Sequence, residues 1–132
     1  MISLIYSSQG LIFYQSPFYF QRMATLLAQC FDKNVKLRIT GILGLSNGRF
    51  MQVLEGPTHS VEDMFAAICR DPRHFDVRLI STRSIAERRF GSWSMAFVGP
   101  PVNIEPVFDM IDPKMTVAHE DIVTRLASYI RC

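Results

Sequence analysis

Residues 38–56, RITGILGLSNGRFMQVLEG, decide the fold of this 132-residue chain. Two β-prone runs, 38–45 and 49–56, flank the short turn Ser46-Asn47-Gly48. Asn-Gly is among the strongest short hairpin signals, because both residues tolerate a positive φ. The stretch therefore predicts an antiparallel β-hairpin.

The second strand of this hairpin carries an amide among apolar side chains. Successive strand residues alternate between faces, so Phe50, Gln52 and Leu54 share one face. A buried amide must find hydrogen-bond partners. Neighbouring backbone or a place at the sheet edge would satisfy Gln52, and the pattern by itself favours this interpretation. The alternative is that Gln52 faces a polar ligand held against an apolar sheet face.

Length, charge and cysteines narrow the class of protein. A chain of 132 residues is expected to form one domain with a substantial core. Its formal charge of +2 is too small to indicate nucleic acid. Cys30, Cys69 and Cys132 lack metal-ligand spacing, and the first two fall in helical patterns, where we expect them to be buried. We expect a cytoplasmic protein, because neither a signal-peptide pattern nor a segment of membrane-spanning length is present.

The chain before the hairpin predicts a strand and a helix. Residues 2–6 are apolar and β-prone, which is typical of a buried strand. Ser16 followed by Pro17 suits a helix N-cap with proline at the first helical position. Apolar residues then recur at helical spacing to about Phe31, and Asn34 suits the turn that ends the helix.

The chain after the hairpin predicts a second helix and two more strands. Ser60 and Asp63 have the spacing of a capping box, and the helix that they begin is expected to end near Arg70. Residues 75–81 and 93–98 alternate in the manner of strands. One face of the earlier strand is expected to carry Phe75, Val77 and Leu79.

Two further helices are predicted at 105–111 and 116–130, and the second has an apolar stripe. The order of elements predicts an α+β fold, a ferredoxin-like β-α-β-β-α-β sandwich with an additional fifth strand. Two helices cover only one face of such a sheet, so the C-terminal helices are expected to pack on the other face. The stripe consists of Ile122, Val123, Leu126, Tyr129 and Ile130.

Few residue patterns point to a reaction. The sequence has no glycine-rich phosphate loop, no metal-binding cluster and no Ser-His-Asp signature. His59, His74 and His119 are scattered, and we expect them on the surface or in turns. Trp93 and Met95 are expected to share a strand face, which favours core packing over contact with a flat aromatic ligand.

Several motifs nevertheless occur together in a definite order and spacing. They are Tyr6-Ser7-Ser8, Asn34, Ile39-Thr40-Gly41-Ile42-Leu43, GRFMQVLEG at 48–56, Asp71-Pro72-Arg73-His74 and RFGSWSM at 89–95. Phe-x-Gln-x-Leu-Glu-Gly, with Ile-Thr-Gly upstream and Trp-Ser-Met downstream, is a specific combination. Over about residues 1–100 the chain resembles the BLUF (blue-light-using flavin) photoreceptor domain.

The resemblance implies a flavin held non-covalently between two helices, FAD in the first place, with FMN or riboflavin as alternatives. It implies that blue light drives electron and proton transfer from Tyr6 toward the flavin through Gln52, whose amide then rearranges to give a red-shifted state. Trp93 and Met95 match the pair whose exchange of positions carries the signal. The residues implied to bind the cofactor are Tyr6, Leu26, Asn34, Phe50, Gln52, Leu54, Ile68, Arg70, Asp71, His74 and Met95.

The expected function is a blue-light photoreceptor and not an enzyme, with residues 1–100 as the sensor domain and 101–132 as a C-terminal helical extension. We expect it to relay its signal to a downstream protein and to form homo-oligomers, without binding nucleic acid or a membrane. Two alternatives stay open. One is a ferredoxin-like regulatory module that binds a small ligand without photochemistry, and the other is a flavin enzyme, for which the sequence offers no acid–base residue near the ring.

Overall fold

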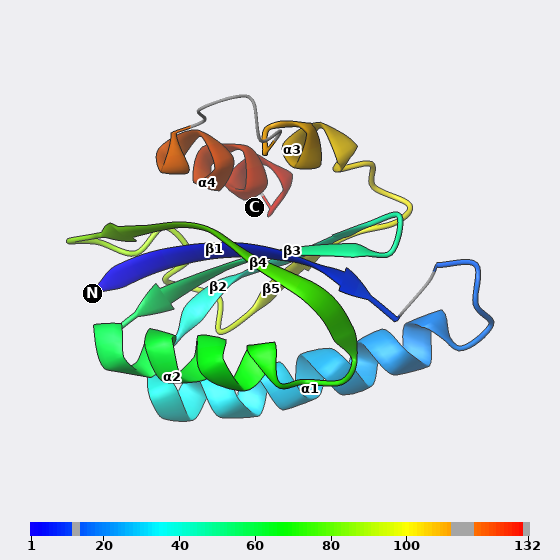
Figure 1. Ribbon diagram of the computed structural model, residues 1–132, viewed down its shortest axis with the longest axis horizontal. Coiled ribbons are helices and arrows are strands. Elements are labelled where there is room, and N and C mark those ends of the chain that lie inside the picture. Colours follow the sequence, from blue (N-terminus) through cyan, green and yellow to red (C-terminus); the bar gives the residue numbers. More distant parts are fainter. Residues whose placement is uncertain (12–13, 112–117, 131–132) are drawn as a thin grey trace.

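A five-stranded β-sheet lies between two layers of helices (Figure 1). The computed structural model describes residues 1–11, 14–111 and 118–130. The elements are β1 (Ile2–Gly10), α1 (Tyr19–Leu37), β2 (Thr40–Ser46), β3 (Arg49–Gly56), α2 (Thr58–Cys69), β4 (His74–Ser84), β5 (Ala96–Val98), α3 (Glu105–Asp109), α4 (His119–Ala127) and the 3-10 turn η1 (Ser128–Ile130). The strand order β4-β1-β3-β2-β5 confirms the predicted ferredoxin-like sheet with an added fifth strand.

The predicted hairpin is confirmed, and two features of its residues explain its geometry. Asn47 and Gly48 both have a positive φ, 50° and 75°, as a two-residue hairpin turn requires. β2 pairs antiparallel with β3 from Thr40 to Ser46, opposite Glu55 to Arg49. A Cβ atom at Gly41 would lie 1.9 Å from the carbonyl oxygen of Val53, so a larger residue there would force the strands apart.

Each face of the sheet packs against its own helices. α1 and α2 cover one face, called here the cleft face, and α3 and α4 cover the opposite face (Figure 1). On that opposite face, Ile122 and Leu126 of α4 are buried in one core with Met51 and Val53 of β3. The expected cover of the second face by the C-terminal helices is thus confirmed. Of the helix predicted at 116–130, residues 116–117 lie outside the described part of the chain.

β5 is an edge strand whose side chains alternate between the two faces. It pairs parallel with β2 over three residues. Ala96 and Val98 are buried in the core under α3 and α4. Phe97 instead packs with apolar side chains of the cleft face, as does Met95, the residue just before the strand. This short segment therefore contacts both cores.

The strand predicted at 93–98 is too long, because its first residues form a turn. Strand pairing begins only at Ala96. The N–H of Trp93 donates to the carbonyl oxygen of Phe90 at 2.9 Å, which is a turn bond rather than a strand bond. The prediction that Trp93 and Met95 share a strand face is therefore wrong.

β4 also departs from the predicted alternation. Val77 packs against the core under α2, but Phe75 and Leu79 are 56% and 53% exposed, so the three do not share a buried face. Two irregularities in the β1–β4 register and a φ of 52° at Asp76 interrupt the period of two. Sequence periodicity does not reveal such irregularities, and it did not indicate that Phe75 and Leu79 stay exposed.

Helix α1 begins and ends later than predicted, and β1 runs past residue 6 to Gly10. Ser16 is not the N-cap, because its hydroxyl accepts a backbone N–H at 3.2 Å in the turn before the helix. Asn34, expected in the terminating turn, is buried inside the helix. Its amide bonds to another part of the fold and so does not compete with the helix backbone. The helix ends at Leu37, and the next residue, Arg38, caps it with a left-handed φ of 58°.

Helix α2 begins before the predicted capping box. Pro57, with a φ of −54°, directly precedes the first helical residue, so Ser60 and Asp63 both lie inside the helix. The capping-box prediction is therefore wrong. The predicted end near Arg70 is confirmed. Cys69, expected to be buried, is exposed at this end.

His119, expected on the surface, is buried and connects α4 to the sheet. Its ring nitrogens lie 2.9 Å from the Ser81 hydroxyl of β4 and 2.8 Å from the Ser3 hydroxyl of β1. Burial lowers the pKa of His119, Glu120 raises it and Arg83 lowers it, with a net decrease. The folded protein therefore holds this imidazole in its neutral form near pH 7.

Within residues 1–11, 14–111 and 118–130, no helix is long and apolar enough to cross a membrane. The same ranges contain no group of three or more His, Cys, Asp or Glu side chains that could hold a metal ion. Cys30 and Cys69 are free thiols.

Truncation of Leu126 tests how much the C-terminal cover stabilises the fold. Leu126 is fully buried, so we expect Leu126→Ala to lower the free energy of unfolding by about 2–5 kcal/mol through lost burial and a residual cavity. Urea denaturation measures this change. The matched control is Leu79→Ala, which removes the same atoms from a half-exposed site and should cost less than half as much. Equal losses at the two sites would show that α4 contributes little.

The His119 contacts predict a pH dependence of stability. The folded-state pKa lies below the ordinary value of about 6.5, so the unfolded chain takes up a proton first as the pH falls. The free energy of unfolding should therefore decrease below pH of about 6.5 and level off below the folded-state pKa. Urea midpoints between pH 8 and pH 5 measure the effect. His119→Gln should flatten the profile, and an unchanged slope would contradict this assignment.

Candidate functional site

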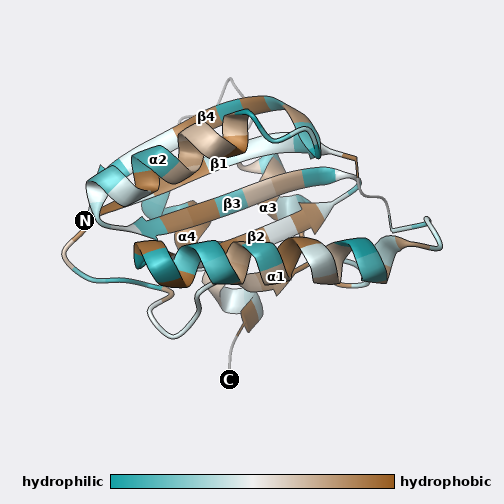
Figure 2. Cartoon of the chain, turned by 90° about the horizontal axis from the view of Figure 1, so that it is seen from below, coloured by the Kyte–Doolittle hydropathy of each residue, from teal (hydrophilic) through white to brown (hydrophobic). Residues whose placement is uncertain are grey.

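A cleft between α1 and α2 opens onto the central strands of the sheet. Figure 2 views the molecule from that side, with β1 and β3 running between the two helices. The cleft has about 680 Å³ of empty space when the part open to solvent is counted. Its lining consists of Tyr6, Leu26, Gln29, Cys30, Lys33, Asn34, Leu43, Phe50, Gln52, Leu54, Met64, Ala67, Ile68, Asp71, Arg73 and His74.

The two helices supply walls that are mainly apolar. Leu26, Cys30 and Asn34 follow one another at intervals of four residues, so they form a single stripe of α1. Met64 and Ile68 have the same spacing on α2 and face that stripe. Two parallel stripes above a sheet leave a narrow slot, which suits a flat ligand better than a round one.

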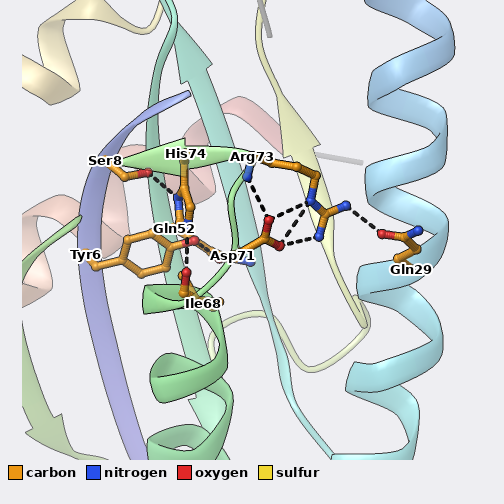
Figure 3. A network of polar contacts seen from close by, with 8 residues as sticks. All are labelled: Tyr6, Ser8, Gln29, Gln52, Ile68, Asp71, Arg73 and His74. Carbon is orange, nitrogen blue, oxygen red and sulfur yellow. Dashed lines mark hydrogen bonds and ion pairs between the residues drawn. The ribbon is translucent and has the colours of Figure 1, made fainter. Parts of the chain in front are cut away.

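The floor of the cleft carries a hydrogen bond between two buried polar side chains. Tyr6 on β1 and Gln52 on β3 are direct cross-strand partners, and the Tyr6 hydroxyl donates to Gln52 Oε1 (Figure 3). Gln52 Nε2 in turn donates to the sulfur of Met95 at 3.3 Å. Tyr6 and Gln52 are only 3% and 4% exposed. Gln52 is thus satisfied by two side chains and not by neighbouring backbone.

Burial keeps Tyr6 in its neutral form. Desolvation raises the pKa of Tyr6 far above its ordinary value, and the nearby Cys30 and Asp71 raise it further, against a smaller opposing effect of Arg73. Release of its proton to water is therefore strongly disfavoured at neutral pH. The hydrogen bond to Gln52 is the route that the structure offers for this proton.

The second amide of the cleft is Asn34. It is 2% exposed although it lies on a helix, and its Nδ2 donates to the carbonyl oxygen of Ser94 at 2.8 Å. Gln52 binds the next residue, Met95. The two amides of the cleft therefore hold two consecutive residues of the segment that leads into β5.

A buried carboxylate holds the start of the same segment. Glu55 is 1% exposed and accepts hydrogen bonds from the backbone N–H groups of Arg89 at 2.7 Å and Phe90 at 2.9 Å. Its third donor is the hydroxyl of Thr40, at 2.9 Å. Arg88 also donates to Thr40, at 2.9 Å. The chain from residue 88 to residue 95 is thus attached to the sheet at both ends.

Polar groups bridge α1 and α2 at one end of the cleft (Figure 3). Arg73 Nε lies 3.0 Å from each carboxylate oxygen of Asp71, and Arg73 Nη1 lies 2.5 Å from Gln29 Oε1 on α1. The hydrogen bond from Arg73 is the main cause that lowers the pKa of Asp71 to about 2, so this carboxylate is ionised at neutral pH. His74 lies between the Ser8 hydroxyl, at 2.8 Å, and the carbonyl oxygen of Ile68, at 2.6 Å.

Nine of the residues that the sequence suggested for ligand binding line the cleft together: Tyr6, Leu26, Asn34, Phe50, Gln52, Leu54, Ile68, Asp71 and His74. Arg70 does not line it and is exposed. Met95 reaches the site through Gln52, whereas Trp93 is 39% exposed. The lining residues that sequence reasoning missed are Gln29, Cys30, Lys33, Leu43, Met64, Ala67 and Arg73. The spacing of four from Leu26 would have found Cys30, but a bridge such as Arg73 to Gln29 has no sequence signal.

The lining matches a flat heteroaromatic ring with polar atoms along one edge. Apolar walls exclude water from the faces of such a ring, and amides can donate to and accept from its edge. Asn34 and Gln52 are the amides at the base of the slot, and each has a further donor or acceptor beyond the bonds described above. The donor set therefore fits a flavin ring.

The fold and this cleft define a ferredoxin-like domain with a slot between two helices that suits a flat ring. A family model described as BLUF, sensors of blue-light using FAD, matches residues 1–96. The chain belongs to the BLUF family. The matched domain is accordingly a blue-light-sensing flavin module and not an enzyme.

Relatives and solved structures of this family agree with the match. The chain is 31% identical over 94 residues to the blue light- and temperature-regulated antirepressor BluF of Escherichia coli (strain K12). This match covers 67% of the chain and 23% of the relative. It superposes on the photo-activated state of BlsA with a TM-score of 0.79 at 28% identity, over 96% of this chain and 94% of that one. For the dark state of the BLUF protein BlrB, the TM-score is 0.77 at 25% identity, over 98% and 96%.

The curated relatives are much longer proteins. The chain spans 23% of the antirepressor and 9% of the photoactivated adenylate cyclase subunit beta of Euglena longa, to which it is 34% identical over 74 residues. The similarity to these relatives therefore covers only a part of each of them.

Proposed function

We propose that the cleft between α1 and α2 holds a non-covalently bound flavin, and that the Tyr6–Gln52 pair converts blue light into a structural signal for a partner protein. One observation supports this above all: the Tyr6 hydroxyl donates to Gln52 Oε1 on the cleft floor, and Gln52 Nε2 donates to Met95. A photoactive phenol needs a proton acceptor at hand, and Gln52 is that acceptor. The change at the amide must also reach other parts of the protein, and Met95 is in direct contact with the same amide.

A flavin, when bound, supplies blue-light absorption and an excited state that accepts an electron. Tyr6 would be the electron donor in this proposal, and its proton would leave along the hydrogen bond to Gln52, which would pass a proton on toward the flavin. Burial of Tyr6 supports concerted loss of electron and proton, because a positively charged phenol radical is disfavoured in a desolvated site. Electron and proton would then return to Tyr6, and the Gln52 amide would be left with its donor and acceptor sides exchanged, which would shift the absorption band to the red.

The same rearrangement gives the signal its direction. Gln52 Nε2 holds Met95, and Asn34 holds Ser94. A turned Gln52 amide no longer offers the same donor to Met95. The segment before β5 would therefore be the first part of the chain to respond to the rearranged amide. Trp93, half-exposed in that segment, can then meet a partner or exchange places with Met95.

We assign residues 1–100 to the sensor and residues 101–132 to a helical extension, and we propose a cytoplasmic protein that acts through a downstream protein and self-associates without contacting nucleic acid. The relatives are named as a light-regulated antirepressor and as photoactivated cyclase subunits, so outputs differ within the family. Lys33 and Arg73 line the cleft beside the predicted ligands and are added to the proposed flavin contacts.

The photochemical roles are tested by substitution of the floor residues. Tyr6→Phe keeps the ring shape and removes the phenol, so flavin should bind and the red-shifted state should not form. Gln52→Leu should also keep bound flavin and abolish the shift, because no amide is left to rearrange. Difference spectra under steady blue light measure both. A wild-type red shift in either variant would contradict the assigned role.

Trp93→Ala and Met95→Ala serve as matched variants outside the floor of the cleft. Each should retain the red shift, because the Tyr6–Gln52 pair is intact, and each should change the rate of dark recovery. Loss of the shift in both would move the photochemistry away from the cleft floor. A yellow protein without any light-dependent difference would support a flavin enzyme instead.

A simpler test is whether the flavin is attached covalently or non-covalently. The cleft offers non-covalent contacts, and Cys30, the cysteine that lines it, has its pKa raised by burial, which disfavours the reactive thiolate. Heat or acid should therefore release all the yellow colour into the supernatant, as measured by absorbance after precipitation. Colour that stays with the precipitate would indicate a covalent link. A colourless protein that takes up no added flavin would support the small-ligand module without photochemistry.

A further inference from the structure

Helix α1 carries a second apolar stripe on the side that faces away from the cleft. Its members recur at spacings of three and four residues, so they lie in one row along the helix. At 3.6 residues per turn, this row lies roughly 140° around the helix axis from the residues that line the cleft. The row is called here the outer stripe, and none of its members lines the cleft. It consists of Phe20, Ala24, Leu27, Ala28, Phe31 and Val35.

The outer stripe is exposed although it is apolar. Phe20, Phe31 and Val35 are 73%, 54% and 52% exposed, and both alanines are exposed as well. A whole aromatic side chain presents about 150–250 Å², so the two phenylalanines alone expose roughly 200–300 Å². Val35 and the alanines extend this surface further. Contiguous apolar surface beyond a few hundred Å² is typical of an interaction site.

The charged side chains of α1 lie outside the outer stripe. Lys33 lines the cleft and Arg22 lines a hollow beside it, while Asp32 and Lys36 are exposed to solvent. A helix side that met only water would normally carry polar residues. The outer stripe therefore suits an apolar protein surface better than water or a charged ligand.

The helix that presents the stripe is held firmly on the sheet. Leu27, a partly buried member of the stripe, packs against the core cluster that includes Leu43 and Phe50 of the central strands. Near the C-terminal end of α1, Asn34 Nδ2 donates to the carbonyl oxygen of Ser94 at 2.8 Å. The stripe is thus a preformed surface, and little conformational entropy is lost when a partner binds it.

Two copies of the stripe fit each other in an antiparallel orientation. When the pair is centred between Leu27 and Ala28, these two residues oppose each other and Phe31 of each copy lies opposite Ala24 of the other. Each large side chain then meets a small one, as close packing requires. A parallel pair would instead set Phe31 against Phe31 and Ala24 against Ala24. The antiparallel contact uses the same row on both copies, so it closes as a two-fold dimer.

The size of this contact predicts a reversible dimer. Phe20 of each copy lies opposite Val35 of the other, so the contact runs roughly 22 Å along each helix at 1.5 Å per residue. The phenylalanines of two copies contribute roughly 400–600 Å² of buried surface. The rest of the stripe and its polar neighbours bring the total toward about 1,200 Å², the lower end for specific interfaces. We therefore expect a dissociation constant in the micromolar range.

We propose that the outer stripe of α1 is a homodimer interface, in which the stripes of two copies pack antiparallel with Phe31 of each copy against Ala24 of the other. This inference rests on the self-association that forms part of the proposed function, and it names the surface that brings the copies together. The cleft stays open in such a dimer, because its lining lies on a different side of α1.

Sedimentation velocity of the full-length protein tests the interface. Between about 1 and about 200 μM, the unmodified protein should change from monomer to dimer. Ala24→Glu and Phe31→Lys each bury a charge against an apolar residue in both halves of the two-fold contact. Each should therefore weaken dimerisation at least about tenfold. A protein that stays monomeric over the whole range would overturn the proposal.

A mixture of the two variants tests the antiparallel orientation. When one copy carries Ala24→Glu and the other carries Phe31→Lys, the two new charges oppose each other and attract. The second half of the contact keeps its original pair of side chains. An equimolar mixture should therefore form a heterodimer at concentrations where each variant alone is monomeric. A mixture that stays monomeric there would overturn the antiparallel contact.

Phe75→Lys is the matched control. Phe75 on β4 is 56% exposed, close to the 54% of Phe31, but it lies on a different element. This variant should dimerise as the unmodified protein does. A dimer that is lost in Phe75→Lys and kept in Phe31→Lys would move the interface to β4 and overturn the proposal. The three substituted side chains are exposed, so each variant should keep the thermal midpoint of the unmodified protein to within a few degrees.

Flavin uptake by the same samples separates this inference from the light-sensing function. A monomer that binds flavin and shows the red shift would overturn the dimer interface alone. A dimer that depends on the outer stripe but takes up no flavin would support the interface and overturn the flavin site.

Discussion

The hydrogen bond between Tyr6 and Gln52 is the contact on which the site depends, and strand register makes it. The two residues oppose each other in the antiparallel β1–β3 pair. Side chains alternate along a strand, so a slip of one residue would turn Gln52 to the face covered by α3 and α4. Close approach of β2 at Gly41 and the tight turn at Asn47-Gly48 hold the neighbouring hairpin in register. The backbone thereby positions the amide before any ligand arrives.

The second constraint is that buried polar groups must be satisfied. The amides of Gln52 and Asn34 lie among apolar side chains, and both direct a donor at the segment 94–95. The Glu55 carboxylate, nearly inaccessible to water, receives backbone donors from the other end of the same segment. The irregular chain before β5 thus has a defined course although it lacks strand pairing, because side chains of β3 and α1 satisfy it.

The sequence predicts most of this arrangement and fails at identifiable points. Alternation in β3 correctly separates Gln52 from Met51, and the Asn47-Gly48 turn correctly predicts the hairpin. The predictions of helix ends failed where tertiary contacts override local preference. Asn34 is an example, because its amide is bound to a residue sixty positions away. The prediction of a surface position for His119 failed for the same reason, since the serines that bind its ring lie on two different strands.

The same limits apply to the site. Periodicity and the family resemblance indicated the apolar walls and the floor, because those residues repeat at regular intervals or carry specific motifs. The bridge from Arg73 to Gln29 joins two elements through side chains alone. Arg70, suggested as a ligand, is exposed at the C-terminus of α2 and does not line the cleft. Such details depend on where a helix ends, which local sequence defines least well.

β5 has a mechanical consequence that follows from its alternation. Its residues are covalently continuous with Met95, which belongs to the cleft side, yet Ala96 and Val98 are embedded in the core beneath the C-terminal helices. A β-sheet otherwise separates the helices that pack on its two faces. Residues 95–98 contact both layers at the edge of the sheet, so a rotation of the backbone at Met95 would act directly on Ala96, which packs on the opposite face. The helices that cover the far face are in this way coupled to a cleft that they never touch.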